Sequence, residues 1–595
     1  MQPAVLQGVA PVLNFDAADL IVSYLESIGV EYVFGIPGGA IEPLYNALAR
    51  SQRNGGLHPV VARHETGAAF MADGYARETG RIGVCIATSG PGSTNLITGV
   101  SCAYDNHIPM LLITGQPALP SFGKHALQES TCTGVNILSM FQHCTCYNTL
   151  VSHAEQLEYK LVNAFMRAHQ AQRPAHLSIP IDVLRSPLKQ SAPAYDLRSR
   201  LQKTSFFDEH TVHQLADEIR HAHKMVFVIG GGCAEAIAPI MELIHRTHGL
   251  FITTPDGKGL INPAHPAYRG VFGFAGHQTA IDLLLGKPDL ILAFGAAMGE
   301  FNSGAWNTML LNERLVHIDS LEDHLLRTPM AKLHVQGCLQ TVCRHLLDEL
   351  QKESAPAGVS PVAHLAVLPS ADKASVSDAT PIKPQRLMRE LSRRCPPTTR
   401  ILADAGNSMS WAVHHLQLCD RRVTLRKQDG ITAIYRERRY SDVGWLRVVT
   451  NFAPMGWAIG AAIGVARGTP DCPVVCITGD GAWLMSGQEI TTAVQEQLTV
   501  IFISLNDSAY GMVKHGQRLT GGEPIAFELP PVDFGMMAQS MGVPSHVIHS
   551  PADLDALDFD VIFQRRGPTL LDVRIDPEEV PPMGQRVKTL TGQQP

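Results

Sequence analysis

The sequence Pro473-Val474-Val475-Cys476-Ile477-Thr478-Gly479-Asp480-Gly481 is an apolar run that ends in a glycine turn carrying an acid. A second apolar run, Thr499 to Leu505, ends in Asn506-Asp507, and Ser486 to Gln497 between them has a helical pattern. We therefore predict a strand, a helix and a second strand in that order. Parallel strands open their ligand crevice at their carboxyl ends, so the two acids should meet there.

The two acids suit a particular kind of ligand. Two oxygen ligands beside tight glycine turns favour a Mg²⁺ ion that keeps some water and shares its coordination shell with a diphosphate. Gly-Asp-Gly alone is also a common turn. The same motif followed at this spacing by an Asn-Asp pair is much more specific, and it predicts a diphosphate and metal site.

The composition is that of a folded, multidomain protein. The chain has 595 residues, of which 45% are hydrophobic and 17% charged, so we expect about three domains with ample cores. The net charge of −7 gives no reason to expect nucleic acid as a partner. Residues 1–14 lack the pattern of a signal peptide, and no apolar run suits a membrane helix. The twelve cysteines are scattered, so we expect a reduced, cytoplasmic protein without membrane contact.

The order of strand and helix signals predicts an α/β protein with three doubly wound parallel-sheet domains. Two stretches rich in Pro, Ala and Ser divide the chain, one near Ser191 and one from Lys352 to Lys383. The expected parts are an N-terminal domain, a central Rossmann-like domain, a linker, a C-terminal domain and a tail. Their bounds are 1–190, 191–352, 353–383, 384–575 and 576–595.

The first block contains three further turns that suit a ligand. The run from Val33 to Ala40 is a strand entering a glycine turn, with a helix expected from Glu42. Glu65 begins another helix, where the helix dipole favours an acid. Ser89 to Asn95 is a third turn, built of small residues that let the backbone approach a ligand. Taken alone, Glu65 is better explained as an acid that only stabilises its helix.

The chain resembles the acetolactate synthase group of thiamine-diphosphate enzymes over nearly its full length. The segments that carry the resemblance keep their order and spacing. They are Phe34 to Ala40, Arg63 to Glu65, Met71 to Arg77, Thr88 to Gly92, Ile113 to Gln116, Ala126 to Glu129, Pro454 to Gly456 and the Gly479 to Gly481 motif. The resemblance implies pyrimidine-binding, central and diphosphate-binding domains.

The resemblance also implies roles for single residues. Glu65 should hydrogen-bond N1′ of the aminopyrimidine, and Met455 should support the cofactor from below in its bent conformation. Gly39 would offer a backbone N–H to a developing alkoxide, and Gln128 would line the same cleft. Asp480, Asp507 and the carbonyl of Ala509 are the expected Mg²⁺ ligands. The remaining expected cofactor contacts are Gly406, Asn407, Ser408, Gly479, Gly481, Ala482, Tyr510, Gly511 and Met512.

The substrates implied by the resemblance are 2-oxo acids, most simply two pyruvates joined to acetolactate. Gly516 stands where the anabolic enzymes have Trp, and Leu127 stands where Phe is common, so the acceptor pocket should be larger. Lys514 and His515 are candidates to bind an acceptor carboxylate, against two exposed loop cations. The cofactor should lie between subunits of a homodimer or homotetramer.

Other interpretations stay open from the sequence. The central block has glycine turns after its strands, such as Gly230-Gly231-Gly232, but none has the full dinucleotide fingerprint, so FAD is undecided. A carboligase or decarboxylase of bulkier 2-oxo acids is one alternative. A flavin-dependent oxidase and a non-catalytic paralogue are the others.

Overall fold

The computed structural model describes residues 15–131, 133–190, 192–202, 205–351, 367, 372–418, 424–428, 431–435 and 444–592, with 424–428 and 431–435 given by their backbone alone. The described chain forms two compact units. The first holds residues 15–72 and 81–202, and the second holds 73–80 and the described residues from 205 onward. In the described residues, no helix is long and apolar enough to cross a membrane.

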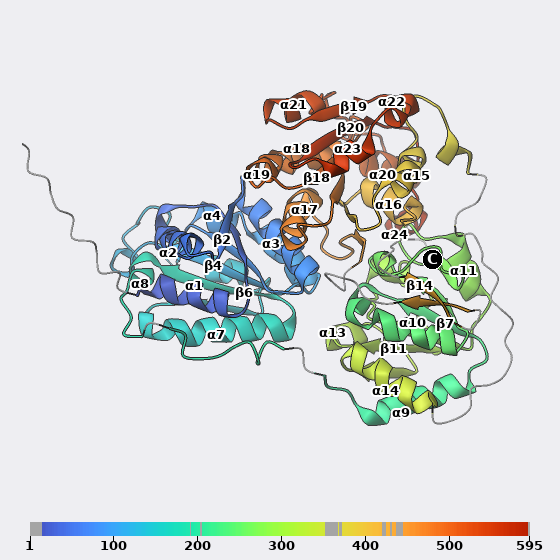
Figure 1. Ribbon diagram of the computed structural model, residues 1–595, viewed down its shortest axis with the longest axis horizontal. Coiled ribbons are helices and arrows are strands. Elements are labelled where there is room, and N and C mark those ends of the chain that lie inside the picture. Colours follow the sequence, from blue (N-terminus) through green and yellow to red (C-terminus); the bar gives the residue numbers. More distant parts are fainter. Residues whose placement is uncertain are drawn as a thin grey trace, which may run out of the picture. The chain divides into compact units, whose positions relative to one another are not determined.

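The first unit is built on a six-stranded parallel sheet with the strand order β2-β1-β3-β4-β6-β5 (Figure 1). The order reverses between β1 and β3, which makes their carboxyl ends the switch point of the sheet. The strands are β1 (Tyr32–Gly35), β2 (His58–Val61), β3 (Gly83–Ala87), β4 (Met110–Gln116), β5 (Tyr147–Leu150) and β6 (Pro174–Pro180). The helices are α1 (Ala17–Ser27), α2 (Glu42–Arg53), α3 (Glu65–Thr79), α4 (Pro91–Thr94), α5 (Ile97–Asp105), α6 (Ile137–Phe141), α7 (Ala154–Ala171) and α8 (Ile181–Leu184).

The second unit contains a middle sheet, of order β12-β11-β10-β7-β8-β9, also all parallel. Alternate residues of β7 enter two different cores, since Phe227 packs in one and Val226 in the other. Both faces of this sheet are therefore buried. The strands are β7 (Met225–Ile229), β8 (Leu250–Thr253), β9 (Tyr268–Val271), β10 (Leu290–Phe294), β11 (Leu315–Asp319) and β12 (Leu333–Gln336). The helices are α9 (Glu209–His221), α10 (Ile237–Arg246), α11 (Gln278–Leu285), α12 (Glu300–Ser303), α13 (Glu322–Leu325) and α14 (Leu339–Gln351).

A third parallel sheet, of order β16-β13-β17-β18-β20-β19, completes the second unit. Its strands are β13 (Arg400–Ala403), β16 (Leu446–Arg447), β17 (Val474–Gly479), β18 (Val500–Asn506), β19 (Ser545–Ile548) and β20 (Thr569–Arg574). Its helices are α15 (Pro384–Arg394), α16 (Asn407–His415), α17 (Trp457–Gly468), α18 (Asp480–Ser486), α19 (Ile490–Gln495), α20 (Gly511–Thr520), α21 (Phe534–Ser540), α22 (Pro551–Asp555), α23 (Phe559–Gln564) and α24 (Gly584–Leu590). A separate antiparallel pair joins β14 (Thr424–Gln428) to β15 (Ile431–Tyr435). The predicted class, three doubly wound parallel sheets, is confirmed.

The helix predicted from Ser486 to Gln497 is present, but its bounds and its continuity are wrong. The helical segment begins at Asp480 and is divided into α18, a 3₁₀ turn from Gly487 to Glu489, and α19. The break falls at Gly487, where a Cβ would lie 2.7 Å from the indole Nε1 of Trp483. The bulky Trp483 thus requires a glycine at the point where the helix changes.

Two other predicted segments are partly visible. Residues 353–366 and 368–371 of the expected linker lie outside the described residues. The end of the linker is described, and it contains a 3₁₀ turn from Lys373 to Val376. The expected tail packs on the second unit over its described part, since Arg586 Nη1 donates to Glu300 Oε1 at 2.6 Å. The proposed domain boundaries remain as predicted from the sequence.

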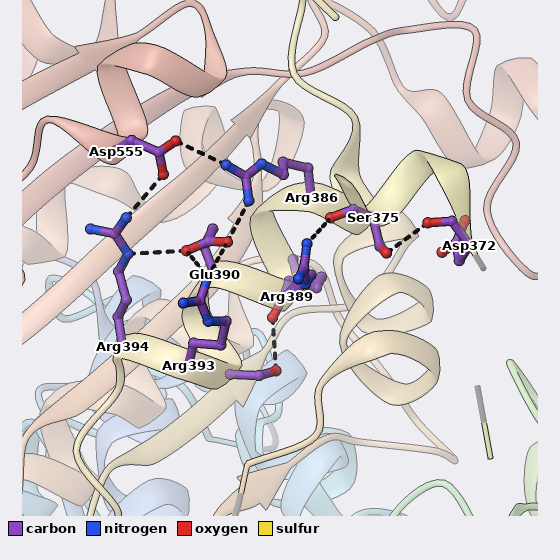
Figure 2. Close-up of polar contacts among 10 residues, drawn as sticks. Asp372, Ser375, Arg386, Arg389, Glu390, Arg393, Arg394 and Asp555 are labelled. Carbon is purple, nitrogen blue, oxygen red and sulfur yellow. Dashed lines mark hydrogen bonds and ion pairs between the residues drawn. The ribbon is translucent and has the colours of Figure 1, made fainter. Parts of the chain in front are cut away.

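A buried carboxylate joins α15 to α22 through a cluster of arginines (Figure 2). Glu390 is 1% exposed and is bonded by Arg386, by Arg393 at 3.2 Å and by Arg394 at 3.1 Å. Arg386 and Arg394 also each reach Asp555 at 2.9 Å. Burial opposes the ionisation of Glu390, but the hydrogen bond from Arg394 and the arginine charges outweigh it and hold the pKa of Glu390 below its usual value.

Glu390→Gln should destabilise the second unit by about 3 kcal/mol, because three guanidinium groups lose their buried counter-charge. Since the folded-state pKa is lowered, the stabilisation by Glu390 is present above its unfolded-state pKa and is lost as pH falls through the folded-state value. Thermal unfolding of the cofactor-free protein at several pH values measures both effects. The exposed Glu523→Gln is the matched control, and equal unfolding temperatures for the two variants at neutral pH would contradict the prediction.

Candidate active site

The third sheet changes its winding direction between β13 and β17, and the predicted diphosphate residues gather at this switch point. β13 leads to the turn at Gly406, and β17 leads to Gly479 and Asp480. The neighbouring strand β18 ends at Asn506, directly before Asp507. The apolar runs fix these strands in register, and the polar residues that follow therefore meet at one edge.

Asp480 and Asp507 are brought together at this edge. Asp480 is 3% exposed, and its Oδ2 accepts hydrogen bonds from the backbone N–H groups of Asp507 and Ala509, both at 3.2 Å. Burial raises the pKa of Asp480. Burial, and after it the charge of Asp480, raise the pKa of Asp507 to about 7. Two acids that oppose each other's ionisation are a donor set that a divalent cation would stabilise.

The glycines around this edge divide into two kinds. A Cβ at Gly479 or Gly406 would meet no atom within 4 Å, and Gly406 has a φ of +106°. At both turns the space where a side chain would begin is open. A Cβ at Gly511 would instead lie 2.4 Å from Asn407 Nδ2 and 2.8 Å from Asp507 Oδ2. Asn407 and Asp507 thus approach each other across Gly511, and the buried Oδ1 of Asn407 has no hydrogen-bond partner in the described residues.

Met455 lies beside the same edge. A Cβ at Gly481 would lie 3.4 Å from Met455 Cε and 2.6 Å from Tyr510 Cε1, so both side chains pack on the Gly481 backbone. The residue after Met455 is Gly456, which has a φ of +86° and directly precedes α17. The methionine therefore lies at a tight turn and not in a core packed by helices.

The helix α16, which starts at Asn407, is held at its other end by a buried lysine. Lys258 is 0% exposed, and its Nζ donates to the carbonyl oxygens of Val413 at 2.6 Å and Ala412 at 3.4 Å. Burial lowers the pKa of Lys258. A donor at the carboxyl end of a helix satisfies carbonyl groups that have no partner within the helix.

Glu65 stands at the start of α3 in the first unit, as predicted. It is 9% exposed, and its Oε2 accepts a hydrogen bond from Asn95 Nδ2 at 2.9 Å. A Cβ at Gly92 would lie 3.2 Å from Glu65 Oε1, so the second carboxylate oxygen faces the glycine turn after β3. The turn after β3 thus holds the Glu65 carboxylate in two ways, by the side chain of Asn95 and by the nearby backbone of Gly92.

Gly39 and Gln128 belong to the same end of the first sheet. A Cβ at Gly38 would lie 2.6 Å from Thr88 Cβ, which packs the turn before Gly39 against the turn after β3. A Cβ at Gly90 would lie 2.9 Å from Gln128 Cβ. Gln128 is exposed and has a φ of +59°. The N-terminal candidates therefore form one group in the first unit, and the diphosphate candidates form another in the second.

Lys514 and His515 are not exposed loop cations. Both lie on α20, where His515 is 1% exposed and Lys514 Nζ bonds Glu578 Oε1 at 2.6 Å. The helix α20 runs from Gly511 to Thr520 and includes Gly516. A Cβ at Gly516 would meet nothing within 4 Å.

The glycine turns of the middle sheet make close contacts with other residues of the protein. Gly232 N donates to Gly295 O at 2.9 Å, and a Cβ at Gly230 would lie 2.2 Å from the same oxygen. A Cβ at Gly231 would lie 2.8 Å from the carboxylate oxygen Oδ2 of Asp256. The glycines at the switch point of this sheet are thus explained by close contacts within the protein.

Two residues in these groups were missed from the sequence. Asn95 holds Glu65, and its backbone oxygen also accepts from Thr66 Oγ1 at 2.5 Å. Asp404 is completely buried at the end of β13. The only sequence signal for Asn95 was its place in the small-residue turn, and the only one for Asp404 was its place after an apolar strand.

Three models of the thiamine pyrophosphate enzymes match this chain. The N-terminal TPP binding domain matches residues 15–137, the central domain matches 212–346, and the C-terminal TPP binding domain matches 431–573. The chain therefore belongs to the thiamine pyrophosphate enzyme family, in its acetolactate synthase-like group.

Full-length relatives support this grouping. The chain is 30% identical over 575 residues to the acetolactate synthase isozyme 1 large subunit of Escherichia coli, covering 95% of each protein. It is 31% identical over 571 residues to the isozyme 2 large subunit of the same organism, covering 94% of this chain and 96% of that protein. A probable acetolactate synthase large subunit of Methanococcus aeolicus is 28% identical over 599 residues. An identity near this level establishes the family and leaves the substrate open.

Proposed function

We propose that this protein is a decarboxylating carboligase that joins two 2-oxo acids, with the formation of acetolactate from two pyruvates as its main reaction. The observation that carries the proposal is the pair Asp480 and Asp507 at the switch point of the third sheet, in a chain whose thiamine-binding domains are both present. The similarity to acetolactate synthase large subunits over nearly the whole chain supports the same choice.

The residues present fit thiamine diphosphate and Mg²⁺. When bound, the cofactor supplies the nucleophilic carbon and the electron sink for loss of CO₂. Asp480, Asp507 and the carbonyl of Ala509 would hold the metal, and the open turns at Gly406 and Gly479 would offer backbone N–H groups to phosphate oxygens. The side chains and backbone of Asn407, Ser408, Gly481, Ala482, Tyr510, Gly511 and Met512 would complete this contact surface.

Glu65 and Met455 would prepare the cofactor. A carboxylate held by Asn95 can share a proton with the ring nitrogen N1′, and its burial excludes water from that proton. Met455 would provide an apolar support beside Gly481. Gly39 would donate its N–H to the reacting oxygen, and Gln128 would line the cleft. In the proposed homodimer or homotetramer, each site would combine the two groups from different subunits.

We propose further that the reaction uses no FAD. A dinucleotide phosphate placed at the switch point of the middle sheet would meet the carboxylate of Asp256 over Gly231. Asp256 is held there by Thr254 Oγ1 at 2.5 Å and by Asn302 Nδ2 at 3.3 Å. A fixed negative charge at this point disfavours a second anion.

Incubation of the purified protein with thiamine diphosphate, Mg²⁺ and pyruvate, followed by mass analysis and a visible spectrum, tests the proposal. Acetolactate without flavin absorbance is the expected result. If products form only from larger 2-oxo acids, the substrates are those acids and not pyruvate. Acetaldehyde as the only product would identify a decarboxylase. Absence of product with every acid would favour a non-catalytic paralogue.

Gly516→Trp should narrow the range of acceptor acids several-fold in favour of the smaller ones. Gly516 has open space where a side chain would start, so the indole should fill part of the acceptor pocket without disturbing α20. Relative rates with pyruvate and with longer 2-oxo acids measure the effect. Gly522→Trp, on an exposed position nearby, is the control, and an unchanged substrate profile in Gly516→Trp would refute the pocket assignment.

A further inference from the structure

A single buried carboxylate connects the separate pieces of the diphosphate half of the site. Asp404 is 0% exposed and follows the last residue of β13. Its Oδ2 accepts from the backbone N–H of Gly456 at 2.8 Å and from Thr478 Oγ1 at 2.9 Å. Its Oδ1 accepts from the backbone N–H of Ala458 at 3.3 Å and of Ala405 at 3.0 Å. All four donors are satisfied by two carboxylate oxygens.

These donors belong to elements that carry site residues. Gly456 directly follows Met455, and Ala458 lies in the first turn of α17, where a negative charge is favoured. Thr478 stands two residues before Asp480 on β17. The backbone oxygen of Asp404 also accepts from Ser408 Oγ at 2.8 Å, in the first turn of α16.

The turn at Gly456 needs this support. Its φ of +86° is a left-handed conformation, and a Cβ there would lie 2.4 Å from Ser486 Oγ. Met455 can face the Gly481 backbone only while the turn keeps this shape. A hydrogen bond from Gly456 N to a fixed carboxylate restrains the turn at the residue next to the methionine.

We infer that Asp404 is a positioning residue that fixes Met455 relative to the Gly479 to Asp480 turn, and so sets the alignment of the cofactor for reaction. The inference rests on the proposed function, because it gives Met455 its supporting role. Asparagine at 404 has the same shape, but its amide nitrogen would face two donors. Burial raises the pKa of Asp404 to about 6, so the acceptor form prevails at neutral pH.

The kinetic test is a double-mutant cycle of Asp404→Asn and Met455→Ala. Each single variant should lose on the order of 100-fold in turnover, the scale expected for a misplaced reacting group. The double variant should be no slower than Met455→Ala alone, because Asp404 acts through the methionine. The inference would be overturned if the loss in the double variant equalled the product of the two single losses, or if Asp404→Asn left turnover unchanged.

A second measurement does not depend on turnover. Hydrogen exchange of the cofactor-free full chain should show faster exchange in the segment containing Gly456 and Ala458 for Asp404→Asn. Asp319→Asn is the matched control, since Asp319 is 2% exposed at the end of β11 and accepts from Leu321 N at 2.9 Å. Exchange that rises equally in both variants would show a general loss of stability and would overturn the inference. Absence of carboligation by the unaltered protein, with the local exchange effect present, would refute the proposed function alone.

Discussion

Glu65→Gln is expected to reduce turnover by roughly 10²- to 10⁴-fold, the range associated with a positioned acid or base. The amide keeps the size of the side chain and its hydrogen bond with Asn95, but it cannot share a proton with N1′ of the cofactor. The cofactor's affinity should change little, because the diphosphate contacts lie in the other unit. Steady-state turnover and a thiamine diphosphate binding titration measure the two quantities.

The control for Glu65→Gln is another acid in the first turn of a helix. Glu155 lies in the first turn of α7 with an exposed side chain, so Glu155→Gln tests the effect of such an acid on its helix. This variant should keep full turnover. Equal losses in Glu65→Gln and Glu155→Gln would show that Glu65 only stabilises α3.

Asp480→Asn is expected to weaken the Mg²⁺-dependent binding of thiamine diphosphate on the order of 100-fold, because the buried ligand loses its charge. The same substitution at Asp507 should leave binding largely intact, because the amide keeps an oxygen ligand and the pKa of Asp507 is already raised to about 7, so less charge is lost there. The two residues have the same side chain and lie at the same edge of the sheet, with Asp480 the more buried of the two. Each variant is purified without cofactor, supplied with saturating thiamine diphosphate and titrated with Mg²⁺. The Mg²⁺ concentration at half-saturation is then compared between the two variants.

Without metal, the substitution of Asp507 should raise the thermal stability of the protein. Asp507 has a folded-state pKa raised to about 7, so its ionisation at higher pH costs stability when no cation is present. Asp507→Asn should therefore unfold at a higher temperature than the unaltered metal-free protein at pH 8. Equal weakening of cofactor binding by the two substitutions would contradict the assignment of Asp480 as the principal ligand.

Much of the third sheet could be predicted because its central strands are continuous apolar runs. The runs ending at Thr478 and Leu505 correspond to β17 and β18 within one residue at each end. Such runs are typical of parallel strands buried on both faces. The acids that follow them could be placed at one edge for the same reason.

The helix after Asp480 was predicted wrongly because its boundaries depend on packing. Asp480 itself begins α18, and the contact of Gly487 with Trp483 divides the helical segment. Periodicity alone does not reveal which aromatic ring will lie against a glycine. The same limit applies to His515, because the local pattern does not reveal that this residue of α20 is buried.

The hydrogen-bond partners of the site could not be predicted either. Asp404 is one acid among many in the sequence. Two of its four donors, Gly456 and Thr478, are 52 and 74 residues away along the chain. Asn95 reaches Glu65 only because the turn after β3 lies against the start of α3 in the fold. Long-range pairs of this kind follow from strand order, which the local pattern leaves undetermined.

The most direct test of carboligation is the stoichiometry of CO₂ release. Purified protein with thiamine diphosphate and Mg²⁺ is supplied with pyruvate, and the CO₂ released is measured against the pyruvate consumed. Joining two 2-oxo acids predicts one CO₂ for every two pyruvate molecules, with the rate of release lowered by roughly 10²- to 10⁴-fold in the Glu65→Gln variant. One CO₂ for each pyruvate would contradict carboligation and identify a decarboxylase or an oxidase.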